Sequence, residues 1–380
     1  MTPRNVTYRR AANGPLYGGK YVYPAWRVGL APFEYCEVPN TALSSVAPST
    51  TPPGIAGPSA KINGWCGAAT IRESSGYMNG PDGGHADYAG NEMSVCYLNR
   101  DTPAWEVLRG PTANADYYDN CVVNKDLSRS SPHTYWCKQF DDFNNRMLVV
   151  STYVPFGLPG VPTAPGDWPW PSSTPGPLMA FDMKTKNWLP PNTLGNFPFG
   201  KSGGIDLTCS DPVNNKVYYV KDSHGKLFEY NMRTATWREC GNWYLNGGYC
   251  GSAVDSKRGR ILAVGDFAAA RDPEHRKTSD ATLSGLSFGG LGASALRMSG
   301  YPGIVYDEAN DWFLVFKNNS PIDVYRVRAS DLYVDMPTIT GTKPAQRPNG
   351  IQNSVQYMPE LKGVAIANSY TGNIKFLATS

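Results

Sequence analysis

The chain has 380 residues, of which 41% are hydrophobic and 12% aromatic, so it can build a sizeable core and global disorder is excluded. Its formal net charge is only +3 and its lysines and arginines are scattered, which argues against a nucleic-acid partner. No apolar run approaches the ~18 residues of a membrane-spanning helix, so no membrane partner is expected either. The 39 glycines, 32 prolines and 23 tyrosines favour short strands joined by many turns.

The chain begins with an arm, residues 1–24, that precedes the predicted domain. The arm is rich in tyrosine and basic residues and has no apolar stretch of the kind found in secretory signals. We therefore expect the protein to be made in a cytoplasm and not to leave by the signal-peptide route. Arms of this kind commonly attach a domain to a larger assembly, so we expect this one to contact a neighbouring protein.

A hairpin phrase recurs along the chain from residue 141 onward. In each copy an aspartate ends one apolar strand, four turn residues follow, and a basic residue opens a second apolar strand; the last copy has Trp312 in the basic position. The aspartates are Asp141, Asp211, Asp255 and Asp307. An aspartate at this place can accept backbone N–H groups of the turn, which is typical of a β-hairpin.

A second phrase follows most hairpins: an apolar strand, a polar turn, and an aromatic residue that opens a further strand. Its aromatic residues include Trp105, Trp188, Trp237 and Tyr333. Two phrases together make four antiparallel strands, and most of the aspartates are spaced as in a propeller blade of about 40–50 residues. The longer gap between Asp141 and Asp211 indicates an insertion within one blade.

The repeats predict an all-β fold, a β-propeller of six blades that occupies residues 25–380 as one domain. The expected blades are residues 62–110, 131–192, 202–243, 247–292, 298–340 and 349–380. The last blade lacks an outer strand, and residues 33–38 form a strand without a partner of its own. We expect this N-terminal strand to close the ring. A seventh blade stays open as an alternative, because segment 111–130 and the fourth blade are irregular.

Pairs of glycines recur where the inner strands of a propeller crowd together near the axis. They are Gly83-Gly84, Gly203-Gly204, Gly247-Gly248 and Gly289-Gly290. Glycine tolerates both close backbone approach and positive φ, so these pairs are expected beside the axis. Glycine pairs followed by a tyrosine-containing strand and a tryptophan resemble the pattern of kelch repeats, and the resemblance covers nearly the whole chain.

The most distinctive stretch, residues 83–92, carries several side chains that can bind a sugar or transfer a proton. The catalytic candidates are His85, Tyr88, His133 and Tyr135, and the ligand-binding candidates there are Asp87, Asn91 and Glu92. His133 and Tyr135 open the next blade, so we expect the two stretches to meet at one end of the ring. Hydrogen bonding between blades, ligand binding and catalysis all remain open as roles for them.

The insertion, residues 154–177, contains eight prolines together with Trp168 and Trp170. Its proline content predicts an extended loop that loses little entropy on ordering. Tryptophans exposed on such a loop would suit docking to a protein or stacking on a sugar ring. The alternative is a loop that folds over its own blade.

Eight cysteines are spread along the chain without a C-x-x-C motif, and the four histidines do not cluster with them. This pattern predicts neither a metal site nor a cofactor, and favours buried, mostly reduced thiols.

Residues 65–92 and 132–135 also resemble kelch-like proteins encoded in tailed-phage genomes, and this resemblance extends over roughly residues 26–150. That resemblance implies a virion location. Our leading interpretation is a non-enzymatic virion component that contacts other virion proteins through the arm and the 154–177 loop, and binding of a host-surface polysaccharide stays open as an additional role. The histidines and tyrosines are similar in type to the acid and base of propeller polysaccharide lyases of the ulvan-lyase kind. A lyase or hydrolase acting on an acidic polysaccharide is therefore the enzymatic alternative, and an intracellular protein-binding kelch module is a third.

Overall fold

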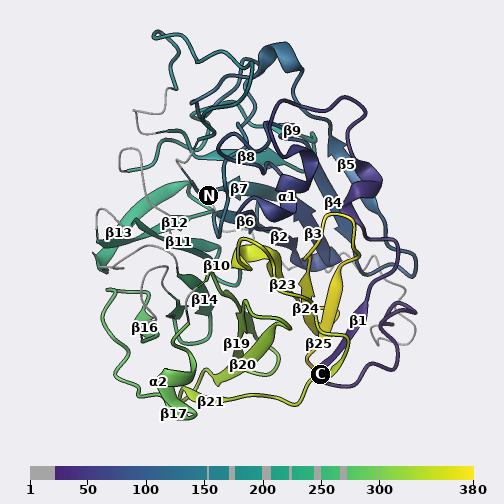
Figure 1. The fold of residues 1–380 in the computed structure, drawn as a ribbon. Helices are drawn as coiled ribbons and strands as arrows, with labels where there is room; N and C mark the ends of the chain where they lie inside the picture. Colours follow the sequence, from purple (N-terminus) through teal and green to yellow (C-terminus); the bar gives the residue numbers. More distant parts are fainter. Residues whose placement is uncertain are drawn as a thin grey trace, which may run out of the picture.

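Six small sheets follow one another in a ring around a central axis in the computed structural model of the chain (Figure 1). The structure describes residues 22–151, 154–170, 176–198, 207–221, 225–243, 250–265, 272–298 and 300–380. In this part of the chain no helix is both long and apolar enough to cross a membrane.

The blades are antiparallel sheets whose first strand lies nearest the axis. Blade 1 consists of β2 (Ala69–Ile71), β3 (Gly76–Asn79), β4 (Met93–Tyr97) and β5 (Trp105–Arg109). Blade 2 consists of β6 (Lys138–Asp141), β7 (Arg146–Val149), β8 (Met179–Asp182) and β9 (Asn187–Trp188). Blade 3 consists of β10 (Leu207–Asp211), β11 (Lys216–Lys221), β12 (Lys226–Asn231) and β13 (Thr236–Asn242).

The other three blades depart from the four-stranded pattern. Blade 4 has β14 (Gly251–Asp255), β15 (Arg260–Val264) and β16 (Glu274–Lys277) in the described residues. Blade 5 has β18 (Gly303–Asp307), β19 (Trp312–Lys317), β20 (Asp323–Arg328), β21 (Tyr333–Asp335) and an added β17 (Gly289–Gly290). Blade 6 has β23 (Val355–Met358), β24 (Gly363–Ile366), β25 (Lys375–Ala378), β1 (Glu34–Glu37) and an added β22 (Thr340–Gly341).

The six inner strands form a closed circle. Each of β2, β6, β10, β14, β18 and β23 contacts the next, and β23 contacts β2. The prediction of a six-bladed propeller is therefore confirmed, and segment 111–130 adds no further blade. That segment instead lies outside the sheets and forms a small hairpin-like turn in which the N–H of Asn124 donates to the carbonyl of Ser128.

The ring is closed by the N-terminal strand, as the sequence predicts. Strand β1 pairs antiparallel with β25, with Tyr35 opposite Leu377, and in Figure 1 the purple β1 runs beside the yellow β25. Just after the arm the chain is also attached to blade 1, because the N–H of Ala25 donates to Oδ1 of Asp101 at 2.7 Å. The ring of Trp26 packs edge-on against Phe376. Residues 1–21, most of the predicted arm, lie outside the described residues.

The recurring aspartates end the inner strands and hold the turns that follow. Oδ1 of Asp141 accepts the N–H of Asn144 at 3.0 Å, and Asp211, Asp255 and Asp307 repeat this contact within their own turns. All four side chains are buried. The left-handed position of each turn is taken by Asn145, Asn215, Gly259 or Asp311, all with φ between 53° and 62°. The side chain of Asn144 also donates to the carbonyl of Met232, which ties blade 2 to blade 3.

The glycine pairs are not a uniform marker of the axis. Gly289 and Gly290 form β17, which pairs in parallel with β21 on the outer edge of blade 5. The expectation for this pair was therefore wrong, and the predicted range of the fourth blade was too long at its end. The pairs at 203–204 and 247–248 lie outside the described residues.

Trp136 fills the axis at the end of the ring where the inner strands begin, which we call the entry face. It comes just before β6 and is 1% exposed. Its indole N–H donates to the carbonyl of Pro302, before β18, and its own carbonyl accepts the hydroxyl of Thr208 on β10. Toward the other end of the ring a cavity of about 110 Å³ runs between the inner strands of all six blades. Trp136 therefore joins three blades at the axis.

Candidate functional site

The two polar stretches singled out in the sequence meet on the entry face. One is the loop between β3 and β4, and the other leads into β6. The ring centroids of His85 and His133 lie 4.1 Å apart with an interplanar angle of 34°. The prediction that these stretches come together is therefore confirmed. We call the partly exposed surface formed by Trp65, His85, Asp87, Phe156 and Tyr301 the entry-face site.

Gly83 and Gly84 make this approach possible. Both have positive φ, +148° and +51°. A Cβ on Gly84 would lie 2.0 Å from Cδ2 of His133, which is closer than any real contact, so the histidine packs on bare backbone. The N–H of Gly84 also donates to the carbonyl of Ser131 at 2.8 Å, which fixes the loop to the strand entering blade 2.

His133 stands at the centre of a short chain of polar contacts. Its Nε2 lies 3.0 Å from Oδ2 of Asp87, and its Nδ1 lies 3.4 Å from the hydroxyl of Tyr135. The His133 side chain is 1% exposed, whereas that of Asp87 is 24% exposed. The carboxylate thus orients a buried imidazole while keeping one side toward solvent. A carboxylate, an imidazole and a phenol in this order can hold or relay a proton.

His85 is sandwiched between two rings. One face is against His133, and the ring centroid of Phe156 lies 4.3 Å away on a tilted ring. Burial, with a smaller contribution from His133, lowers the pKa of His85 to about 4. His85 is therefore neutral at pH 7, and its imidazole can both donate and accept a hydrogen bond.

Aromatic side chains surround the two histidines. The ring of Trp65 lies 4.9 Å from that of His133, Tyr301 is stacked at 6.5 Å from Tyr135, and Phe156 is 47% exposed. Backbone strain gathers here as well, because four of these residues have positive φ: Trp65 (55°), His85 (36°), Tyr135 (42°) and Tyr301 (59°). Such conformations cost roughly 1–3 kcal/mol each and are commonly found at functional sites.

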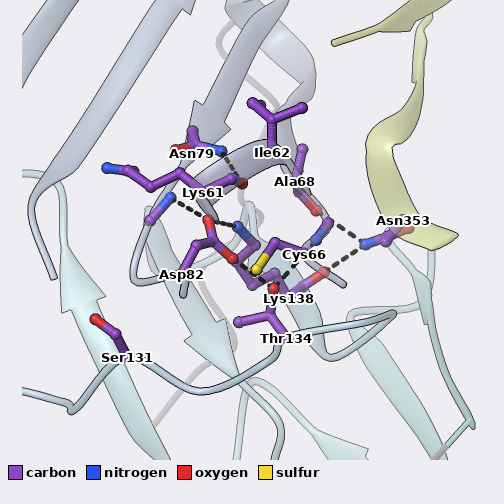
Figure 2. A network of polar contacts seen from close by, with 12 residues as sticks. Lys61, Ile62, Cys66, Ala68, Asn79, Asp82, Ser131, Thr134, Lys138 and Asn353 are labelled. Atoms are coloured by element: carbon purple, nitrogen blue, oxygen red, sulfur yellow. Dashed lines mark hydrogen bonds and ion pairs between the residues drawn. The ribbon is translucent and has the colours of Figure 1, made fainter. Parts of the chain in front are cut away.

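A fully buried ion pair joins the loop that carries His85 and Asp87 to the strand that follows His133 (Figure 2). Nζ of Lys138, the first residue of β6, lies 2.5 Å from Oδ2 of Asp82, and both side chains are 0% exposed. Asp82 also accepts hydrogen bonds from the hydroxyl of Thr134 at 2.6 Å and from the N–H of Gly80 at 2.9 Å. From blade 6, Nδ2 of Asn353 donates to the carbonyl of Lys138 at 2.8 Å. This layer fixes the segment that carries His133.

Three of the predicted site residues, Tyr88, Asn91 and Glu92, are buried inside the protein. The hydroxyl of Tyr88 donates to Oε1 of Glu92 at 3.0 Å, and Nζ of Lys61 lies 3.1 Å from the same oxygen. Burial and the neighbouring Glu92 raise the pKa of Tyr88 far above its usual value. Asn91 is 0% exposed and donates to the hydroxyl of Ser128. Direct contact of Tyr88, Asn91 or Glu92 with a surface ligand is not favoured by these positions.

The insertion contributes a different aromatic residue from the two expected. Trp168 and Trp170 are half-buried and pack edge to face at 5.7 Å, and the indole N–H of Trp168 donates to the carbonyl of Val123. The described part of the loop thus folds back over segment 111–130. Phe156 is the residue of the insertion that reaches the entry-face site. It is held there because Oδ2 of Asp119 accepts the N–H of Gly157 at 2.9 Å.

Trp65, Phe156 and Tyr301 were not predicted as site residues. Trp65 lies before β2, Phe156 in the insertion and Tyr301 before β18, and no local motif links them. Trp65 and Tyr301 share one signal with the buried Tyr135, because each of the three stands two to four residues before an inner strand. In the described residues, no group of three or more His, Cys, Asp or Glu side chains could hold a metal ion.

The comparison with known proteins shows the fold alone. No family model and no curated protein matches the sequence. Among solved structures, an auxiliary nutrient binding protein from Bacteroides ovatus matches with a TM-score of 0.50 and 11% identity, over 91% of this chain and 77% of that one. A chain of a nidogen/laminin complex matches with a TM-score of 0.42 and 10% identity over 74% of this chain and 83% of that one. A chain of the mitotic checkpoint complex matches with a TM-score of 0.45 and 9% identity over 87% and 91%.

Proposed function

We propose that this propeller is a glycan-binding module whose ligand lies across the entry-face site. A propeller fold is consistent with binding of either protein or carbohydrate, and the arrangement on the entry face favours carbohydrate. The observation that carries the proposal is the set of three accessible aromatic rings beside the two histidines. Phe156 lies against His85, Trp65 lies against His133, and Tyr301 is stacked on Tyr135, whose hydroxyl contacts His133. Sites for small ligands typically combine aromatic walls with a few polar groups that fix orientation.

The site is also pre-formed, which favours binding. Its polar groups are held by buried partners, Asp87 by His133 and the His133 segment by the layer around Asp82. A ligand therefore would not have to order these side chains, and less of its binding free energy would be lost to entropy. The auxiliary nutrient binding protein that matches the fold supports the proposal only weakly, because an identity of 11% carries no residue-level argument.

The test is glycan binding by wild-type protein and two variants, measured by calorimetry on polysaccharides chosen from an array. Trp65→Ala and Phe156→Ala should each weaken binding by about tenfold or more, because a buried stacking contact is lost. Phe143→Ala is the matched control, since Phe143 is also exposed but lies in the turn after Asp141, at the other end of the ring. Equal affinity in all four proteins would contradict the proposal.

We place this module in a phage virion as part of the same proposal. The support is the resemblance of residues 26–150 to phage-encoded kelch-like proteins. The arm, residues 1–24, and the 154–177 loop would contact neighbouring virion proteins. Mass spectrometry of purified virions tests the location, and cross-linking from residues 1–24 tests the contact. Recovery of the protein only in the unassembled fraction of a lysate would reject the virion role.

An enzymatic role is the second candidate, and the Asp87–His133–Tyr135 chain is the observation that favours it. If the chain transfers a proton to or from a bound polysaccharide, His133→Asn should abolish turnover while glycan binding persists. The assay follows new unsaturated or reducing ends over time. If the wild type binds the glycan without changing it, the enzymatic role is rejected and the glycan-binding role stands.

A further inference from the structure

The charge of the entry-face site carries an inference about which glycans it accepts. Of its five residues, Asp87 is acidic and none is a lysine or arginine. His85 adds no positive charge at pH 7, because its pKa is about 4. The side chain of Asp87 is 24% exposed, so its carboxylate is partly accessible to a ligand at the site.

Two lysines of the buried layer, Lys61 and Lys138, do not offset this charge. Lys61 is 2% exposed and pairs with Glu92, and Lys138 is fully buried and pairs with Asp82. Because both ammonium groups are buried and paired with a carboxylate, neither can contact a ligand at the surface. Recognition of carboxylate or sulfate groups on a sugar normally uses exposed arginine or lysine donors. Among the described residues that form the site there is no such donor.

We infer that the entry-face site selects neutral glycans and rejects chains that carry carboxylate or sulfate groups. This rests on the proposed function and narrows it. Hydroxyl groups of a neutral sugar can donate to Asp87 and exchange hydrogen bonds with His85, while its apolar face lies on Trp65, Phe156 or Tyr301. A uronate or sulfate placed there would lie near the Asp87 carboxylate, and none of the five residues that form the site is a lysine or arginine, so the repulsion between like charges would oppose binding.

The experiment compares matched neutral and anionic polymers: dextran with dextran sulfate, and galactan with polygalacturonate. The affinity for the neutral member of at least one pair should exceed that for its anionic partner by about tenfold or more at low salt. The preference should shrink in 0.5 M NaCl, where charge repulsion is screened.

Asp87→Asn tests the cause of the preference. The amide keeps an oxygen that can accept a hydrogen bond from His133 but removes the charge, so binding of the anionic polymer should rise while the melting temperature stays close to that of the wild type. Glu239→Gln is the control, because Glu239 is a carboxylate that is 47% exposed on β13, the outer strand of blade 3, and its removal should not alter the preference.

The outcomes separate the inference from the proposed function. Tighter binding of the anionic polymers, or a preference that Asp87→Asn leaves unchanged, would overturn the inference while glycan binding stands. Failure of all four polymers and of a wider neutral panel to bind would overturn the proposed function, and the inference would fall with it. Loss of folding in Asp87→Asn would be revealed by its melting curve, and the salt dependence of the wild type would then decide.

Discussion

The ammonium nitrogen of Lys138 and the Oδ2 oxygen of Asp82 lie 2.5 Å apart with no exposure to solvent on either side chain. The pair joins the first strand of blade 2 to the loop between β3 and β4 of blade 1, on which Gly84, His85 and Asp87 stand. The site is therefore held by a buried ion pair between two blades. Its stability depends on both partners, because a buried charge that loses its partner is costly.

Lys138→Met should lower the free energy of unfolding by about 3–5 kcal/mol, because the Asp82 carboxylate would stay buried without its cation. Chemical denaturation at pH 7 measures the loss. Lys226→Met is the control, since Lys226 pairs with Glu239 at the surface and should cost about 1 kcal/mol or less. Similar losses in the two variants would mean that the buried pair has no special role.

Deleting residues 1–40 should destabilise the ring and promote aggregation. The deletion removes β1, so the edge of β25 would lose its antiparallel partner and expose unpaired backbone groups. Light scattering and thermal melting check this result. A truncated protein that stays monomeric with an unchanged melting temperature would show that ring closure by this strand contributes little.

All eight cysteines are free in the structure, and denaturing, non-reducing mass spectrometry should find eight alkylatable thiols. In the folded protein alkylation should be slow, because burial raises the pKa of Cys96, Cys121 and Cys209 to about 12. The half-buried Cys36 and Cys240 should react before these three. A mass that indicates three or four bridges would contradict the expectation of reduced thiols.

Acid should destabilise the fold in part through His85. Its pKa is about 4 when folded and ~6.5 when unfolded, so the unfolded chain binds more protons between these values. The free energy of unfolding should therefore fall as the pH drops from 6.5 to 4. His85→Gln should flatten this part of the profile. His275, whose pKa burial also lowers to about 4, acts in the same direction, so the double variant His85→Gln/His275→Gln should be flatter still.

The blades were predictable because the same local chemistry recurs in each. Asp141, Asp211, Asp255 and Asp307 all cap the turn that follows them, and the unmatched strand at residues 33–38 had to pair with the incomplete last blade. The departures have physical causes too. Gly289 and Gly290 have the composition of an axial glycine pair, but they pair in parallel with β21 at the outer edge of blade 5.

The meeting of His85 and His133 was predictable because one stands in an inner loop of blade 1 and the other leads into blade 2, the next blade of the ring. Trp65 and Tyr301 stand just before inner strands, as Tyr135 does, but that shared place is visible only when the bounds of the strands are known. Phe156 comes from an insertion, and spacing does not place an insertion on the ring. The sequence also did not indicate the side on which Asn91 and Glu92 lie. Both are turned into the protein, where they bond to Ser128 and to Lys61.

Pairing of Tyr35 with Leu377 sets an unusual order of events during synthesis. Strand β1 leaves the ribosome first, but its partner β25 is made roughly 340 residues later, which at 5–20 residues per second is a delay of roughly 15–70 s. Until β22 and β25 are made, β1 lacks both of its strand partners, and the earlier blades form an open arc. The pairing of β1 with β25 is thus the last contact of the ring to form. Nascent chains stalled before residue 375 still lack this contact, and we expect chaperones to bind them.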